Sequence, residues 1–157
     1  NKDGGHAGPP GVAVIRRWTA QADGTVQVNG ALRHSEELGD GIIGRIVSSR
    51  SGMLGQWAVK NRSQSTTINR HTVTKGDTID FIVDCFKVPG ADEFKWAPVV
   101  NMLSVRDPKQ LPPGGSTTWN AQMMFTGPRK TIDARPLQAW EKFAQVLLLT
   151  NELTFYN

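Results

Sequence analysis

Short apolar runs separated by turn signals fill the chain from residue 12 to residue 103. The clearest run is the segment 78–85, in which Ile79, Phe81 and Val83 point to one side and the residues between them point to the other. Strict alternation of this kind is typical of a half-buried strand. We therefore predict a strand at 78–85 that places these three side chains in a hydrophobic core.

Six other segments have the same character, and turn signals such as Asp23-Gly24 separate them. The predicted strands span residues 12–19, 24–34, 42–49, 53–60, 65–73, 78–85 and 94–103. Their spacing of about 10–15 residues, with no helical pattern between them, favours a β-sandwich over alternating strands and helices. The sequence therefore predicts an all-β fold with two packed antiparallel sheets over residues 12–104.

The flanking segments differ in character from this central region. Residues 1–11 are rich in glycine and proline and predict a loose lead-in, whereas residues 105–135 predict an irregular linker. Residues 136–157 predict a C-terminal α-helix, because Pro136 suits a first helical position and apolar residues then recur at helical spacing. This stripe comprises Leu137, Trp140, Ala144, Leu147 and Leu148. It must pack on the sandwich or on a neighbouring part of a longer protein.

Composition and charge narrow the function classes. Eighteen Lys and Arg against 14 Asp and Glu give the 157-residue chain a net charge of +4, and the basic residues form no run. Nucleic-acid binders usually cluster basic residues on one face, so we expect no nucleic-acid partner. The apolar run 146–149 is far shorter than the roughly 20 residues of a spanning helix, so we expect no membrane span. The chain opens on Asn1 rather than Met, and we expect it to be a segment of a longer protein.

Signals for enzymatic chemistry are weak. The single cysteine, Cys85, excludes an internal disulfide and a C-x-x-C motif, and its place at the end of an apolar strand face predicts a buried thiol. His6, His34 and His71 share no metal-ligand spacing, and we expect them to be solvated or in turns. The sequence contains no G-x-S-x-G elbow and no phosphate-binding loop. We therefore predict a protein that is not an enzyme, with no catalytic residues, no metal ligands and no cofactor.

Two arrangements of acidic residues are candidate sites. Asp80 and Asp84 lie on one face of a predicted strand about 13 Å apart, whereas glycosidase carboxylates lie about 5–9.5 Å apart. Within that strand they therefore predict a solvated or ion-paired face rather than a catalytic pair. Asp23, Asp40 and Asp77 each lie beside glycine in a turn, where jelly-roll modules often bind Ca²⁺. Turn chemistry alone explains these dipeptides, and the calcium alternative stays open.

The five tryptophans point to a different chemistry. Sugars stack their C–H faces on aromatic rings, while polar side chains bind the sugar hydroxyls. Trp57 and Trp96 lie beside polar residues near turns and are the candidate stacking rings, with Arg50 and Asp84 as hydrogen-bonding partners. A position in the core is the alternative for each ring. Of the others, Trp18 suits the core, Trp140 belongs to the helical stripe, and Trp119 cannot be placed.

Several segments together resemble a known module. They are IRRWTAQADGTVQVNGALRH, GDGIIGRIVSSRSGMLGQWAV, KGDTIDFIVDC, FKWAP and the tail RPLQAWEKFAQVLLLTNELTFYN. Together they resemble the β-sandwich module and C-terminal end of large planctomycete extracytoplasmic proteins that also carry c-type cytochrome domains. The resemblance implies a jelly-roll-like sandwich similar to non-catalytic carbohydrate-binding modules, and a periplasmic or extracellular location. The cytochrome signature is absent from this chain, so no haem role is implied.

These observations lead to two expected functions. The first is a non-catalytic carbohydrate-binding module of an exported multidomain protein, with polysaccharide as its ligand. An acidic polysaccharide is one option, because arginine side chains such as Arg45 and Arg50 suit carboxylates and sulfates. The alternative is a structural or interaction module that packs against other domains of the parent protein.

Overall fold

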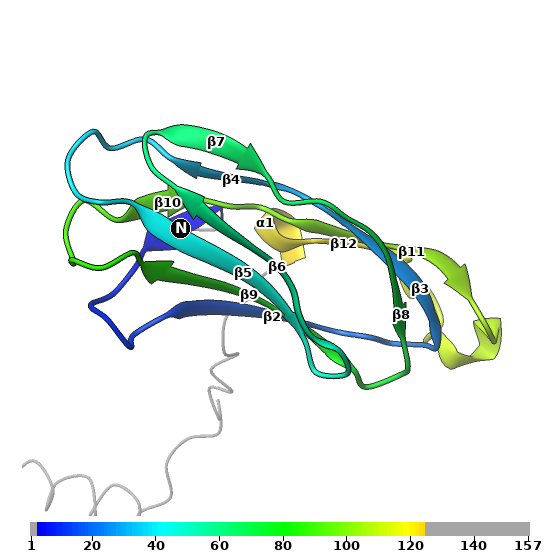
Figure 1. Cartoon of the computed structure of the whole chain (residues 1–157). Coiled ribbons are helices and arrows are strands. Elements are labelled where there is room, and N and C mark those ends of the chain that lie inside the picture. The colour runs from blue at the N-terminus through cyan, green and yellow to red at the C-terminus, as the bar shows by residue number, and fades with distance from the viewer. Residues whose placement is uncertain (1–2, 125–157) are drawn as a thin grey trace, which may run out of the picture. The chain divides into compact units, whose positions relative to one another are not determined.

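The computed structural model describes residues 3–124, which form an antiparallel all-β sandwich followed by a short helix, α1 (Ala121–Met124) (Figure 1). The predicted fold class is confirmed for this part of the chain. The helix predicted at 136–157, with its apolar stripe, lies outside the described residues, as does the end of the predicted linker. Within residues 3–124, no helix has the length and apolar character needed to cross a bilayer.

One layer of the sandwich contains four strands, each antiparallel to its neighbours. In order across the sheet they are β2 (Val14–Thr19), β9 (Thr78–Cys85), β5 (Ile42–Ser48) and β6 (Gly52–Val59). Every second residue of β5 and β9 is buried, because successive side chains of a strand point to opposite faces. β2 and β6 are the edges of this sheet.

The other layer consists of two four-stranded antiparallel sheets whose strands lead into one another (Figure 1). The first sheet contains, in order, β1 (Gly4–His6), β10 (Glu93–Lys95), β4 (Ala31–His34) and β7 (Arg62–Ser65). The second contains β12 (Thr118–Asn120), β11 (Val99–Val105), β3 (Gly24–Asn29) and β8 (Ile68–Val73). β3 leads into β4, β7 into β8, and β10 into β11. The chain crosses repeatedly between the two layers, as expected for a jelly-roll-like sandwich.

Three of the seven predicted strands are interrupted where the two sheets of this layer meet. At the interruptions, the Thr66 N–H donates to the Gly30 carbonyl (2.9 Å), and the Trp96 Nε1–H donates to the Thr66 hydroxyl (3.0 Å). A Cβ atom on Gly30 would lie 3.2 Å from Trp96 Nε1 and 3.3 Å from Pro98 Cα, so a side chain there would crowd both residues. Pro98 also has no N–H with which to continue the ladder. The four predicted strands that are not interrupted form the first layer.

Phe81 lies at the centre of the core between the layers. Its side chain is 1% exposed, and its ring packs edge-on against Trp96, with ring centroids 5.6 Å apart. The Phe81 ring is also stacked on Trp119 at 6.1 Å. Ile79 and Val83 of the same strand are equally buried, so the predicted core face of β9 is confirmed.

Arg16 is an unexpected member of the buried face of β2. Its residue is 5% exposed, and its guanidinium donates to the carbonyl of Trp96 (2.6 Å) and to the carbonyl of Gly4 (3.1 Å). Burial lowers the pKa of Arg16, and the negative charge of Asp3 opposes that shift. Arg16 thus links β2 to β1 and to the interruption that contains Trp96.

The sandwich extends beyond both predicted boundaries. The lead-in predicted as loose contains β1, which pairs with β10, and the predicted linker contains β12, which pairs with β11, and a short 3₁₀ helix, η1 (Pro108–Gln110). A Cβ atom on Gly4 would collide with the Phe94 carbonyl, so glycine permits the close approach of β1. Strands of three residues that contain glycine carry no readable hydrophobic period, which explains why the pattern missed β1.

Candidate functional site

The four predicted ligand-binding residues do not converge on one site. Asp84 pairs in register with Ile43 near the start of β5, whereas Arg50 follows the end of that strand at Ser48. Five residues of extended chain span about 16 Å, so the two polar residues lie near opposite ends of the sheet. Trp57 and Trp96 lie in different layers.

The expectation of an exposed ring at Trp96 is wrong. Trp96 is 2% exposed, and its Nε1–H already donates to Thr66. The cause is the interruption between β10 and β11, which turns the indole inward across Gly30 and onto Phe81. A sugar could reach this ring only if the core opened.

Trp57 is half-buried on the inner side of the edge strand β6. It pairs in register with Gly44, and it packs against the hydrophobic core. Its ring also lies across Gly55, because a Cβ atom on Gly55 would collide with the Trp57 six-membered ring. The ring is therefore only partly accessible and packs along its own strand.

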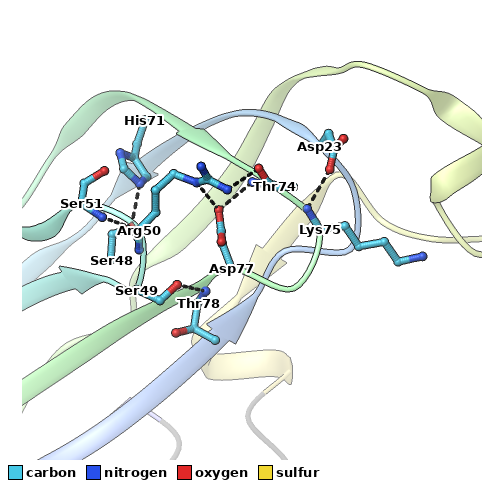
Figure 2. Close-up of polar contacts among 10 residues, drawn as sticks. All are labelled: Asp23, Ser48, Ser49, Arg50, Ser51, His71, Thr74, Lys75, Asp77 and Thr78. Atoms are coloured by element: carbon cyan, nitrogen blue, oxygen red, sulfur yellow. Dashed lines mark hydrogen bonds and ion pairs between the residues drawn. The ribbon is translucent and has the colours of Figure 1, made fainter.

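Arg50 belongs to a polar network between the β5–β6 hairpin and the β8–β9 turn (Figure 2). Its Nε donates to Asp77 Oδ2 (2.6 Å), and its Nη2 donates to the Thr74 hydroxyl. The Thr74 N–H donates to the same Asp77 oxygen (2.7 Å). These bonds, with that of Arg50 first, lower the pKa of Asp77. Arg50 thus fastens two turns together, with Asp77 as its local acidic partner.

Asp84 is ion-paired on the outer face of the first layer. Arg45 Nη1 donates to Asp84 Oδ2, and Arg45 Nε donates to Gln56 Oε1 (3.1 Å). Asp80, the other acidic residue of this face, forms a two-point pair with Arg17 at 2.7 and 2.8 Å. The face is therefore ion-paired, which is one of the two alternatives that the sequence predicted for Asp80 and Asp84.

A serine–histidine contact in Figure 2 also serves the hairpin. His71 Nε2 lies 2.9 Å from the Ser48 hydroxyl, whose oxygen accepts the N–H groups of Arg50 (3.1 Å) and Ser51 (3.3 Å). The Ser48 oxygen accepts those two N–H groups. We therefore assign the Ser48 hydroxyl as the donor to Nε2 of neutral His71. Burial lowers the pKa of His71, which favours that neutral form. Ser48 is 2% exposed, so its hydroxyl stabilises a turn rather than facing a substrate.

His34 departs from the expectation of a solvated or turn histidine. It is fully buried, and both ring nitrogens are engaged. Nε2 lies 2.7 Å from the Ala91 carbonyl, and Nδ1 accepts the Asn61 N–H at 3.1 Å. Through these two contacts the ring joins β4 to two loops.

A cleft of about 260 Å³ lies between β2 and the segment that contains β12. Trp18 and Trp119 line it, together with the apolar side chains of Met102 and Met124. Trp119 is half-buried, with its ring stacked on Phe81. This cleft combines indole rings with polar groups, and sequence reasoning missed it because Trp119 could not be placed. The available signal was the run of hydroxyl residues 116–118 directly before this tryptophan.

The polar groups of this cleft are available for a ligand. The exposed side chains of Thr19, Gln21 and Thr117 line it, and none makes a hydrogen bond within residues 3–124. Arg17 also lines the cleft, but its charge is paired with Asp80. The cleft therefore offers hydroxyl and amide groups beside aromatic surface, with little net charge.

A larger cleft, of about 460 Å³, lies over β1, β10 and β4. Its charged side chains are of both signs: Arg33 and Lys95 are opposed by Glu36 and Glu93. Its one benzene ring, Phe94, is 5% exposed. This cleft suits a charged or strongly polar ligand but lacks an exposed benzene or indole platform.

Cys85 is buried, as predicted. Burial raises the pKa of its thiol, and the negative charges of Asp92, Asp40 and Asp84 raise it further. We expect iodoacetamide at pH 8 to modify the native protein far more slowly than the denatured protein, because the thiolate is the reacting species. Mass spectrometry of timed samples measures this, and equal rates in the two states would contradict the burial of Cys85.

Comparison with known proteins provides no assignment. Protein-family models and curated protein sequences were both searched, and neither set contains a match to this chain. Among the described residues, no three His, Cys, Asp or Glu side chains gather as metal ligands.

Proposed function

We propose that the protein is a non-catalytic carbohydrate-binding module whose ligand site is the cleft between β2 and β12. The observation that carries this proposal is the half-buried Trp119 beside the unpaired polar side chains of Thr19, Gln21 and Thr117. Trp119 offers aromatic surface for a sugar ring, and the three polar groups suit its hydroxyls. Trp57 and Trp96 line neither this cleft nor the larger one and are replaced as the proposed stacking rings.

The chemistry of the cleft favours a neutral polysaccharide. Arg17 is the charged side chain that lines it, and the two-point pair with Asp80 neutralises that charge. Arg45 and Arg50, which suggested an acidic ligand, are both engaged by carboxylates elsewhere. We therefore place a neutral glycan first, within the setting of an exported multidomain protein.

A second function is favoured by the outer face of the first layer. Ile15 is 54% exposed, and it pairs in register with Ile82, which is half-buried. Ile43 and Val47 of β5 are also half-buried on this face, where Ile43 pairs in register with Asp84 and Val47 with Asp80. An aliphatic surface interspersed with ion pairs suits another domain of the same polypeptide. This packing role uses a different surface and is compatible with glycan binding.

Affinity electrophoresis on a polysaccharide panel tests the carbohydrate proposal. The panel contains neutral xylan, mannan and β-glucan beside acidic pectin, alginate and carrageenan. We expect retardation by at least one neutral member, with a Kd in the micromolar-to-millimolar range. Trp119→Ala should weaken binding about five- to tenfold, because an aromatic ring contact contributes on the order of 1 kcal/mol.

Two further variants separate binding from folding. Gln21→Ala changes an exposed side chain of the cleft, so it should weaken binding without changing thermal unfolding. Trp57→Ala is the matched tryptophan control and should bind as the wild type does. Retardation by no panel member would favour the packing function. Binding that survives Trp119→Ala and Gln21→Ala would move the site elsewhere.

A further inference from the structure

Two loops at one end of the sandwich are closely joined. They are the loop 35–41 before β5 and the loop 86–92 after β9. The Phe86 N–H donates to the Gly41 carbonyl (2.9 Å), and the Val88 N–H donates to Asp40 Oδ2 (3.2 Å). Gly39 has a φ of 80°, and a Cβ atom there would lie 2.6 Å from the Gly90 carbonyl oxygen. Glycine at 39 therefore allows the two loops to touch.

Each of these loops carries a carboxylate with an unused oxygen. Asp92 is 0% exposed; its Oδ2 accepts the Gly90 N–H at 2.6 Å, and its Oδ1 is buried without a hydrogen-bond partner. Asp40 Oδ1 is likewise buried and without a partner. These are the two side-chain atoms within residues 3–124 that are buried and unsatisfied. Neither residue belongs to an ion pair described above.

The two carboxylates are also bonded to the same stretch of the second loop. Asp40 Oδ2 accepts the Val88 N–H, and Asp92 Oδ2 accepts the Gly90 N–H two residues further along. An unpaired carboxylate buried away from water is strongly disfavoured, and buried charges in proteins are normally paired or coordinate a metal. Asp92 Oδ1 therefore lacks the hydrogen-bond donor or cation that a buried carboxylate oxygen normally has.

We propose that Asp40 and Asp92 bind one calcium ion that ties the loop 35–41 to the loop 86–92. Carboxylates in irregular loops suit Ca²⁺, which takes six to eight oxygen ligands in flexible geometry. The remaining ligands are main-chain carbonyls of the same loops and water. A zinc-type site is disfavoured, because no three His, Cys, Asp or Glu side chains gather as ligands in the described part of the chain. Both ring nitrogens of the nearby His34 are already engaged.

The competing partners are water and the side chains of Lys60 and Arg62, which line a cleft together with Asp40. Asp92 does not line that cleft, so these cations do not account for its unused oxygen. If calcium rather than water or a basic side chain binds here, added calcium should stabilise the protein, and the effect should depend on Asp92.

Thermal unfolding of the full chain, stripped with a chelator, tests the site. Extracellular modules bind Ca²⁺ with Kd values of about 10⁻⁴–10⁻³ M. At free Ca²⁺ roughly a hundredfold above Kd, we expect the midpoint to rise by about 5–10 °C. NaCl of equal ionic strength is the control for screening, and MgCl₂ is the control for charge. Isothermal titration of the stripped protein should give one site per chain.

Matched variants assign the effect to the two carboxylates. Asp92→Asn and Asp40→Asn should each remove most of the calcium-dependent rise, whereas Asp107→Asn, on a separate surface turn, should keep it. If Asp92→Asn does not fold, Asp40→Asn and the titration still decide. A midpoint unchanged by calcium, an equal rise with MgCl₂, or a full rise in Asp40→Asn would each overturn the proposal.

Discussion

Replacement of Phe81 by alanine is expected to lower the free energy of unfolding by about 3–5 kcal/mol. Phe81 is 1% exposed and contacts the rings of Trp96 and Trp119, so its loss leaves a cavity that both layers border. Because Trp119 stacks on this ring, the variant should also loosen the proposed glycan cleft. Chemical denaturation monitored by tryptophan fluorescence measures the change.

Phe86→Ala is the matched control for this substitution. Phe86 is 39% exposed in the loop after β9, so its removal creates no enclosed cavity. We expect it to change the free energy of unfolding by less than about 1 kcal/mol. Equal losses in the two variants would contradict the position of Phe81 at the centre of the core.

The second large expected effect on the free energy of unfolding comes from replacing Arg16 of β2. Arg16→Met should lower the free energy of unfolding by about 1.5–3 kcal/mol, the range for a hydrogen bond that involves a charged group. The substitution leaves the carbonyls of Gly4 and Trp96 without this donor, although the methionine retains part of the apolar packing. Denaturant unfolding of the wild type and the variant measures the difference.

Arg17→Met is the control, because Arg17 points to the opposite, exposed face of the same strand. Its pair with Asp80 lies at the surface, where such pairs add little stability. We expect this variant to unfold like the wild type. If Arg17→Met were the more damaging of the two, the inward direction of Arg16 would be wrong.

The strands could be predicted because their evidence is local. In β9, strict alternation alone predicts that Phe81 lies in the core, and burial alternates in the same way along β2 and β5. The second layer was harder, since its strands are interrupted where Gly30, Thr66 and Trp96 meet. The three residues come from three separate predicted strands. None of these strands shows a break in its own hydrophobic pattern at that point.

The site depended on contacts that a sequence does not display. Arg16 reads as a polar residue beside Arg17, yet its acceptors lie 12 and 80 residues away along the chain. The polar residues before Trp96 predict an exposed ring, but the interruption after β10 turns the ring inward. Trp119 enters the cleft through the three-residue strand β12, which has no readable period. The turn signal at Asp40 favours calcium in the sequence, whereas no sequence signal marks Asp92.

The central claim, that Trp119 and its neighbours bind glycan, is tested most directly by NMR of the ¹⁵N-labelled full chain. Each of the five tryptophans has one indole N–H signal, which Trp→Phe variants assign. The titrant is a soluble oligosaccharide from the polysaccharide that retards the protein. We predict that the signals of Trp119 and Trp18 shift with ligand concentration while those of Trp57 and Trp96 stay in place. Shifts at Trp57 or Trp96, with Trp119 unchanged, would contradict the proposed site.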